Sequence, residues 1–297
     1  MTSNWNNIPH NTSSRQRRGF RVRPALGQGT PVWTMVGIIF LVAVYGIPLL
    51  WLLATSLKDN RAIFANPGGI IFSPSFHAYK EIAQQGTLGQ AALNSAIISL
   101  GTTILTLLLG MPTAYGLDRV RGVTLTVGLG ALVLLQMIPQ TATIIPLYRV
   151  LGVWQLLGTL PGVILADTAL YLPFTVLVLR PFVGGIPLEI EEAAAMDGAR
   201  PGTVFLRIIV PLLSNGIATA ASLIFILAWG EFLYAISILT SPDTYPISAL
   251  ISQQISAYGT SWSGLMALAV VGSLPILVVF VVAQRRLAAG LSLGAVK

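Results

Sequence analysis

The sequence has no cysteine and only two histidines, His10 and His77, among its 297 residues. The lack of cysteine excludes a disulfide framework and a thiolate metal site, and the two distant histidines argue against a histidine metal site. No glycine is followed by lysine, which excludes a GxxxxGK[ST] phosphate-binding loop, and no GxSxG or HExxH sequence is present. We therefore predict that this chain is not an enzyme, with no catalytic residue, no metal and no bound cofactor. Any ATP and magnesium would be held by partner subunits.

Charge is equally scarce. Charged residues make up 9% of the chain, whereas 54% is hydrophobic, and the mean hydropathy is +0.78. No charged side chain occurs in residues 24–57, 82–117, 122–148, 208–230 or 244–284. A helix needs about 20 apolar residues to cross a bilayer, and these runs lack the strict alternation of barrel strands. The composition therefore predicts an all-α integral membrane protein.

We expect six transmembrane helices, at residues 32–55, 92–117, 123–147, 160–180, 208–236 and 263–284. The fourth contains Asp167, whose expected role is an interhelical hydrogen bond. The fifth is long enough to tilt or break, and Gly230 is the expected break point. Together with the segments between them, these helices form one predicted domain, residues 31–297.

Residues 1–30 are rich in asparagine, serine and arginine, and they predict a disordered, basic tail. Arginines next to a first span are more often a topology signal than a nucleic-acid site, so we expect no nucleic-acid partner. If the N-terminus is cytoplasmic, 13 of the 17 Lys and Arg residues fall on the cytoplasmic side. This bias predicts a multi-pass protein of the cytoplasmic (inner) membrane, in contact with its lipid, with both termini in the cytoplasm.

The densest acidic cluster lies between the fourth and fifth spans, and the topology places it in the cytoplasm. The cluster comprises four of the ten acidic residues: Glu189, Glu191, Glu192 and Asp197. Acids crowd the start of a short helix after Pro187, where they favour the helix dipole. Gly198 is expected to end this helix. On composition alone the segment at about 187–200 is a solvated connector.

Its spacing changes that interpretation. Glu192-Ala193-Ala194, then Gly198, Ile208 and Val210-Pro211, resembles the E-A-A-x3-G-x9-I-x-L-P signature of ABC-importer permeases, with Val210 in place of leucine. In that family this loop is the coupling helix, which docks on a cytoplasmic ATPase. The resemblance implies that six residues couple the chain to the ATPase: Glu192, Ala193, Ala194, Asp197, Gly198 and Pro211.

Other segments extend the resemblance over residues 33–297. They include "NSAIISLGTTILTLLLGMPTAYGLDR", "WGEFLYAISIL" and "QRRLAAGLSLGAVK", which are similar to maltose/glycerol-phosphate-type carbohydrate permeases, specifically the MalG-like six-span subunit. The resemblance implies an ABC type I importer permease fold. It also implies an importer built from two permeases, two ATPase subunits and an extracytoplasmic solute-binding protein.

Glu231 is an acid within a predicted span, flanked by Trp229 and Tyr234. Because a carboxylate in the bilayer is costly, it faces either a cavity or a partner. Aromatic faces beside a polar group suit a sugar ring, so the three residues are candidates for the substrate pathway. A structural carboxylate at a helix end is an equally good interpretation.

The outer segment 241–260 carries one charge and many hydroxyl and amide groups. In the family the corresponding loop reaches toward the docked binding protein. The candidate contacts are Ser241, Pro242, Asp243, Gln253 and Gln254.

The function favoured by these patterns is the permease subunit of an ATP-driven importer of a sugar, an oligosaccharide or a polyol. The alternative is an ion-coupled secondary transporter or channel subunit, in which Glu231 could carry the ion. The sequence does not identify the solute.

Overall fold

The computed structural model describes residues 32–69, 71–256 and 259–295. The predicted tail at residues 1–30 lies outside these ranges. The chain divides into two compact units at Pro48, inside helix α1 (Val32–Ser56), and the second unit holds every other element. All long elements are helices, as predicted from the lack of alternating strands.

Four helices of the described chain are long and apolar enough to cross a membrane. They are α1, α4 (Thr87–Arg119), α7 (Leu160–Gly184) and α14 (Trp262–Ala295). They correspond to predicted spans one, two, four and six. The last three extend beyond the predicted ends.

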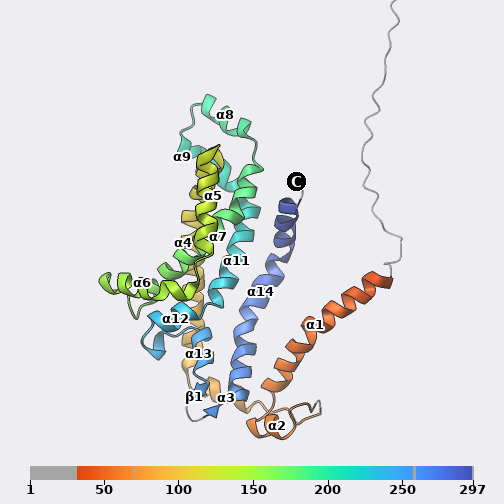
Figure 1. Cartoon of the computed structure of the whole chain (residues 1–297). Coiled ribbons are helices and arrows are strands. Elements are labelled where there is room, and N and C mark those ends of the chain that lie inside the picture. Colours follow the sequence, from red (N-terminus) through yellow and green to blue (C-terminus); the bar gives the residue numbers. More distant parts are fainter. Residues whose placement is uncertain (1–31, 70, 257–258, 296–297) are drawn as a thin grey trace, which may run out of the picture. The chain divides into compact units, whose positions relative to one another are not determined.

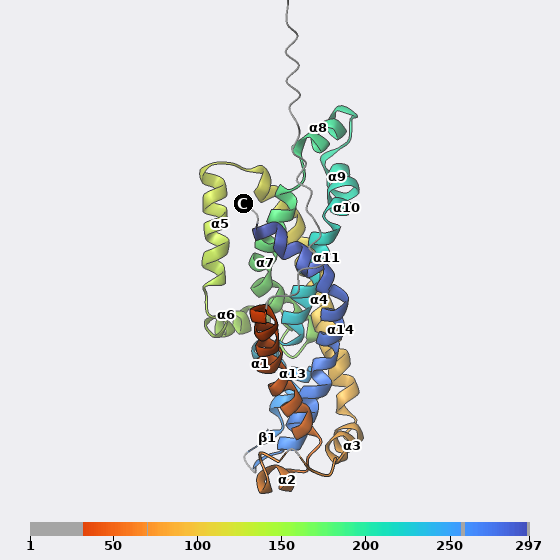
Figure 2. The same cartoon turned by 90° about the vertical axis from the view of Figure 1, so that its right-hand side faces the viewer.

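The third and fifth spans are bent pairs of helices, and counting each pair as one span gives the predicted six. In the third, α5 (Val123–Gln136) and α6 (Gln140–Val153) meet at 93°. In Figure 1 and Figure 2 α6 turns away from the direction of α5. The predicted continuous helix over 123–147 is therefore wrong. Pro139 lies at the break, where it disfavours helical geometry in the preceding residue.

The fifth span begins with three short segments, α9 (Pro201–Val204), the π-helical turn η1 (Phe205–Ile209) and α10 (Val210–Leu212). It then bends by 74° into α11 (Ser214–Trp229). The predicted break at Gly230 is confirmed, since this residue caps α11 and the next helix begins at Leu233. The sequence analysis did not predict the earlier bend, at which a π turn and a proline interrupt the regular hydrogen bonds.

Short elements occupy the two ends of the second unit (Figure 1). At one end, α8 (Leu188–Met196) lies beyond the ends of α4 and α7. The other end carries α2 (Asn60–Ala65), α3 (His77–Gln84) and α13 (Ile247–Ser252). Strands β1 (Ile255–Ser256) and β2 (Gly259–Thr260) pair antiparallel there. Helix α12 (Leu233–Ile238) and the 3-10 turn η2 (Pro242–Thr244) connect α11 to α13.

The centre of the unit is the pair α4 and α7, which pack closely because glycines replace larger side chains. A Cβ atom on Gly101 would lie 2.7 Å from Ile164, and one on Gly110 would lie 2.9 Å from Thr175. Small residues let backbones approach in membranes, where water does not drive helices together. Helix α11 joins them, with Gly216 against the ring of Phe182.

Asp167 is fully buried on α7, and its interhelical hydrogen bond stays a prediction. Neither carboxyl oxygen has a hydrogen-bond partner within the described residues. The hydroxyl of the adjacent Thr168 bonds the carbonyl of Ile164 in its own helix.

Enlarging Gly110 should destabilise the α4–α7 contact. Gly110→Val places atoms against Thr175 where 2.9 Å is already too close for a Cβ, so we expect a loss of about 1–3 kcal/mol. Thermal unfolding of the purified chain in detergent measures it. Gly116→Val is the matched control, because a Cβ there meets nothing within 4 Å. Equal stability of the two variants would contradict the packing argument.

Candidate functional site

The candidate site is the elbow formed by α8 and α9, residues 187–204. Pro187 precedes the first turn of α8, and Glu189 and Glu191 lie in that turn, where carboxylates interact favourably with the helix dipole. Gly198 has a φ of +81°, a conformation that favours glycine. Its N–H donates to the Ala195 carbonyl at 3.0 Å. The predicted helix and its stop at Gly198 are both present, and a second helix, α9, begins at Pro201.

The two faces of α8 differ. Glu192 and Ala193 are exposed, as is Asp197 just after the helix. Ala194, however, is 9% exposed and packs into the core of the chain itself. Met196, which the sequence analysis did not single out, is 87% exposed. The outward surface therefore combines a carboxylate with small and apolar side chains.

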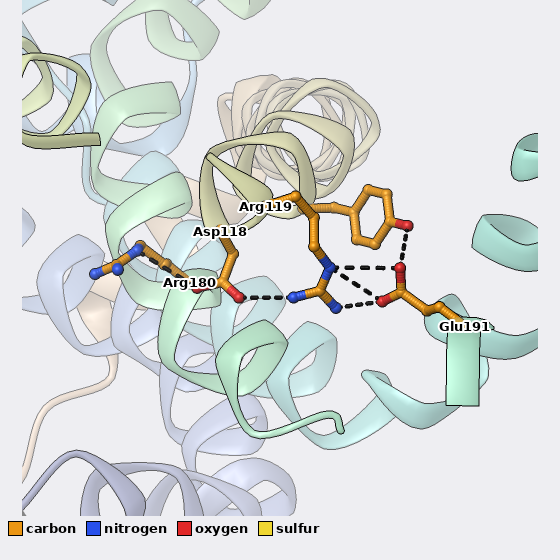
Figure 3. A network of polar contacts seen from close by, with 5 residues as sticks. Asp118, Arg119, Arg180 and Glu191 are labelled. Atoms are coloured by element: carbon orange, nitrogen blue, oxygen red, sulfur yellow. Dashed lines mark hydrogen bonds and ion pairs between the residues drawn. The ribbon is translucent and has the colours of Figure 1, made fainter. Parts of the chain in front are cut away.

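Glu191 faces the opposite way, toward the end of α4, and sequence analysis missed its role (Figure 3). Arg119 donates through Nε to Glu191 Oε1 at 3.1 Å, and its Nη2 also bonds that oxygen. The Tyr115 hydroxyl donates to Glu191 Oε2 at 2.7 Å. Tyr115 and Arg119 are four residues apart, and this spacing places both on one face of α4.

The cluster continues to α7. Arg119 Nη1 donates to Asp118 Oδ2 at 2.9 Å, and Arg180 Nε lies 3.6 Å from Asp118 Oδ1. The two arginines thus balance two carboxylates. All four side chains are between 12% and 32% exposed, so solvent screens these pairs less than it screens fully exposed ones.

The cluster also sets the protonation state of Glu191. Burial by itself raises the pKa of this carboxyl, but the hydrogen bonds from Arg119 and Tyr115 and the charge of Arg119 outweigh it. The pKa of Glu191 is therefore lowered below its ordinary value. The carboxylate is ionised at neutral pH, as its contacts require.

Pro211 lies in α10, one turn before the 74° bend of the fifth span. It has no N–H to donate to the preceding turn. The residues between α8 and the bend belong to the same signature, so the structure places the last position of that signature where the helix changes direction.

The three candidates for the substrate pathway are buried in contacts within the chain. Trp229 Nε1 donates to the Gly272 carbonyl at 2.9 Å. Tyr234 is 2% exposed and shares a hydrogen bond with the Thr143 hydroxyl. Direct contact with a solute remains a prediction for these side chains.

Glu231 is also buried, and it caps α12. Its carboxylate accepts from the backbone N–H groups of Tyr234 at 2.8 Å and Ala235 at 3.0 Å. Gln140 Nε2 of α6 donates to it at 2.8 Å. Of the two interpretations left open by the sequence, the geometry favours the structural carboxylate at a helix end.

The segment from 241 to 254 is held against α4. Asn94 Nδ2 donates to the carbonyls of Asp243 at 2.9 Å and Tyr245 at 3.2 Å, and Ser95 Oγ accepts from the N–H of Ile247 at 2.9 Å. The candidate contacts differ in exposure. Pro242, Asp243 and Gln253 are exposed, whereas Ser241 and Gln254 are half-buried.

No group of three or more His, Cys, Asp or Glu side chains within the described ranges is arranged to hold a metal ion.

Comparison with known proteins identifies the family. Residues 106–293 match the family described as "Binding-protein-dependent transport system inner membrane component". The chain belongs to this family. The match covers the elbow, the bent fifth span and α4 from its middle onward, and it confirms the resemblance to ABC-importer permeases.

Two relatives and one solved structure illustrate the relationship. The chain is 35% identical over 254 residues to the trehalose transport system permease protein SugB of Mycobacterium tuberculosis, covering 84% of this chain and 92% of the relative. It is 31% identical over 252 residues to the sulfoquinovosyl glycerol transport system permease protein SmoH of Agrobacterium fabrum, covering 84% and 88%. A chain of a bacterial ABC transporter involved in the import of the acidic polysaccharide alginate matches with a TM-score of 0.70 at 18% identity, covering 86% and 98%. This confirms the predicted importer-permease fold.

Removing the Glu231 carboxylate should destabilise the protein, because the start of α12 loses its hydrogen-bond acceptor. Glu231→Ala leaves two backbone N–H groups and the Gln140 amide without their acceptor, at about 1–3 kcal/mol for each buried group left unpaired. Thermal unfolding in detergent measures the loss. Asp243→Ala, at an exposed acid, is the control. Unchanged stability of Glu231→Ala would contradict the capping role.

Acid should weaken the contact between Glu191 of α8 and the end of α4. Because the pKa of Glu191 is lowered on folding, its stabilisation is complete above the ordinary glutamate range and is lost as pH falls through the lowered pKa. Hydrogen exchange of residues 188–196, corrected for intrinsic rates, should rise only at a pH below the ordinary glutamate range. Glu191→Gln should show no such transition. A transition at or above the ordinary glutamate range would contradict this assignment.

Proposed function

We propose that the chain is the transmembrane permease subunit of an ATP-driven, binding-protein-dependent importer of a sugar, an oligosaccharide or a polyol. It would work as a heterodimer with a second permease. The observation that carries the proposal is the exposed surface of α8, which lies within the segment that matches the family. The trehalose and sulfoquinovosyl glycerol permeases among its relatives support a carbohydrate-like solute.

The partners follow from what the chain itself lacks. It has no GxxxxGK[ST] loop, so two ATPase subunits would hold ATP and magnesium. Glu192 offers a carboxylate, Ala193 permits close approach, and Gly198 forms the turn that presents them. Closure of the ATPase pair on ATP would displace α8 and shift the permease between inward-facing and outward-facing states.

The solute would arrive from the opposite side of the membrane. The Lys and Arg bias favours a cytoplasmic location for α8 and both termini. The end that carries α3, α13 and η2 would then face an extracytoplasmic binding protein. The exposed side chains of Pro242, Asp243 and Gln253 are available there.

The geometry of Glu231 disfavours the alternative, an ion-coupled transporter or channel. In that alternative Glu231 would carry the ion, so its carboxylate would have to be free to bind and release it. The Glu231 oxygens are instead bonded to two N–H groups and an amide within the chain.

The decisive experiment reconstitutes the chain in liposomes with its neighbouring permease, ATPase and binding protein. ATP hydrolysis and uptake are recorded across a panel of sugars and polyols. We expect one solute, presented by the binding protein, to stimulate both. Failure to assemble with an ATPase, or uptake by the chain alone on an ion gradient, would overturn the proposal.

Gly198→Pro should reduce the stimulated uptake by more than about tenfold, because proline cannot adopt the φ of +81° found at this turn. Glu192→Ala should weaken the contact with the ATPase without altering the fold of the chain. Arg121→Gln, a charge change at an exposed residue outside the elbow, is the control. Intact stimulation in Gly198→Pro would contradict the assignment of α8 as the coupling helix.

A further inference from the structure

Two polar attachments lie at opposite ends of α4. At one end, Tyr115 and Arg119 hold Glu191 of α8. Near the other end, Asn94 and Ser95 hold the segment that follows α12. About 24 residues separate Ser95 from Arg119, a distance of about 36 Å along one helix.

Several hydrogen bonds to one carboxylate hold α8 on α4. The Nε edge of Arg119 meets the Glu191 carboxylate side-on while Nη1 bonds Asp118, an arrangement that the compact ammonium of lysine cannot reproduce. The guanidinium carbon also lies 5.3 Å from the centre of the Tyr115 ring. Three donors on one helix thus fix a single orientation of the carboxylate.

The same cluster extends to α7. Asp118 lies between Arg119 and Arg180, and the α7 backbone approaches it so closely that a Cβ on Gly184 would be 3.2 Å from Asp118 Oδ1. The ends of α4, α7 and α8 are therefore joined by contacts other than the covalent connection from α7 to α8.

In the second attachment, both polar atoms of the Asn94 side chain are hydrogen-bonded. Asn94 is 2% exposed, its amide nitrogen donates to two carbonyls, and its oxygen accepts from Gln90 Nε2 at 3.0 Å. The carbonyls belong to Asp243 and Tyr245. These bonds attach η2 and the residues that lead into α13 to α4. Between the two attachments, α4 is one helix packed on α7 and α11.

We propose that α4 is the connecting helix of this permease: the Glu191 cluster couples α8 to it, and Asn94 couples it to the segment 241–247. A displacement of α8 by an ATPase would then reach the surface that faces the binding protein without passing through the bent fifth span. This rests on the proposed function. Glu191, Arg119 and Asn94 are positioning residues in this scheme.

The test uses the complete importer in liposomes, with the binding protein carrying the solute found above. Two ratios are measured: stimulation of ATP hydrolysis by loaded binding protein, and solute imported per ATP hydrolysed. A merely structural role lowers the amount of assembled importer but leaves both ratios unchanged. The variants are Arg119→Gln, Glu191→Gln and Asn94→Ala, and the control is Arg121→Gln, an exposed arginine two residues beyond α4.

We expect each of the three variants to lower the stimulation by at least about fivefold while Arg121→Gln matches the wild type. The double variant Arg119→Gln/Asn94→Ala should be no worse than its more severe parent, because both changes interrupt one connection. Where a variant does not assemble, Tyr115→Phe removes a single hydrogen bond to Glu191. It should show a smaller loss in the same ratios.

Unchanged ratios in the assembled variants, or multiplicative losses in the double variant, would overturn the connecting role of α4 and leave the importer intact. Absence of stimulation in the wild type would instead overturn the proposed function. The two failures are thus distinguishable.

Discussion

The constraint on which the whole structure depends is that hydrocarbon offers no hydrogen-bond partner to the backbone. Every long element is accordingly a helix, which satisfies its own N–H and C=O groups. Several polar side chains meet the same constraint within their own helix: the hydroxyls of Ser99, Thr103 and Thr175 bond carbonyls of the preceding turn. The two bent spans change direction near a proline or a π turn, which removes regular hydrogen bonds, before α6 and near Pro211.

Close packing then gives α4 its position. In lipid, helices associate through contact and not through expulsion of water, so glycine at an interface determines which backbones approach. Gly101 and Gly110 bring α4 against α7, and Gly216 brings α11 against Phe182. A helix in this central position contacts both ends of the unit, which is why the attachments of Glu191 and Asn94 can act through it.

The acidic cluster between the fourth and fifth spans places two neighbouring carboxylates in different surroundings on one helix. Glu192 is exposed and available to a partner, whereas its neighbour Glu191 is ionised and bonded inside the chain. One residue of separation rotates a side chain by about 100° around a helix. One carboxylate can therefore be bonded inside the chain while its sequence neighbour stays exposed.

The sequence by itself determined the helical class, the six spans, the helix from Pro187 to Gly198 and the family. These follow from apolar run length, the conformational preferences of proline and glycine, and a spaced motif, all of which are local. Only the tertiary structure decided that Ala194 packs inward, that Glu231 caps α12, and that Asp167 has no partner in the described chain. It also joined Glu191 to Arg119 across 72 residues. The physical reason is that such contacts depend on which helix faces meet, and no local preference encodes that.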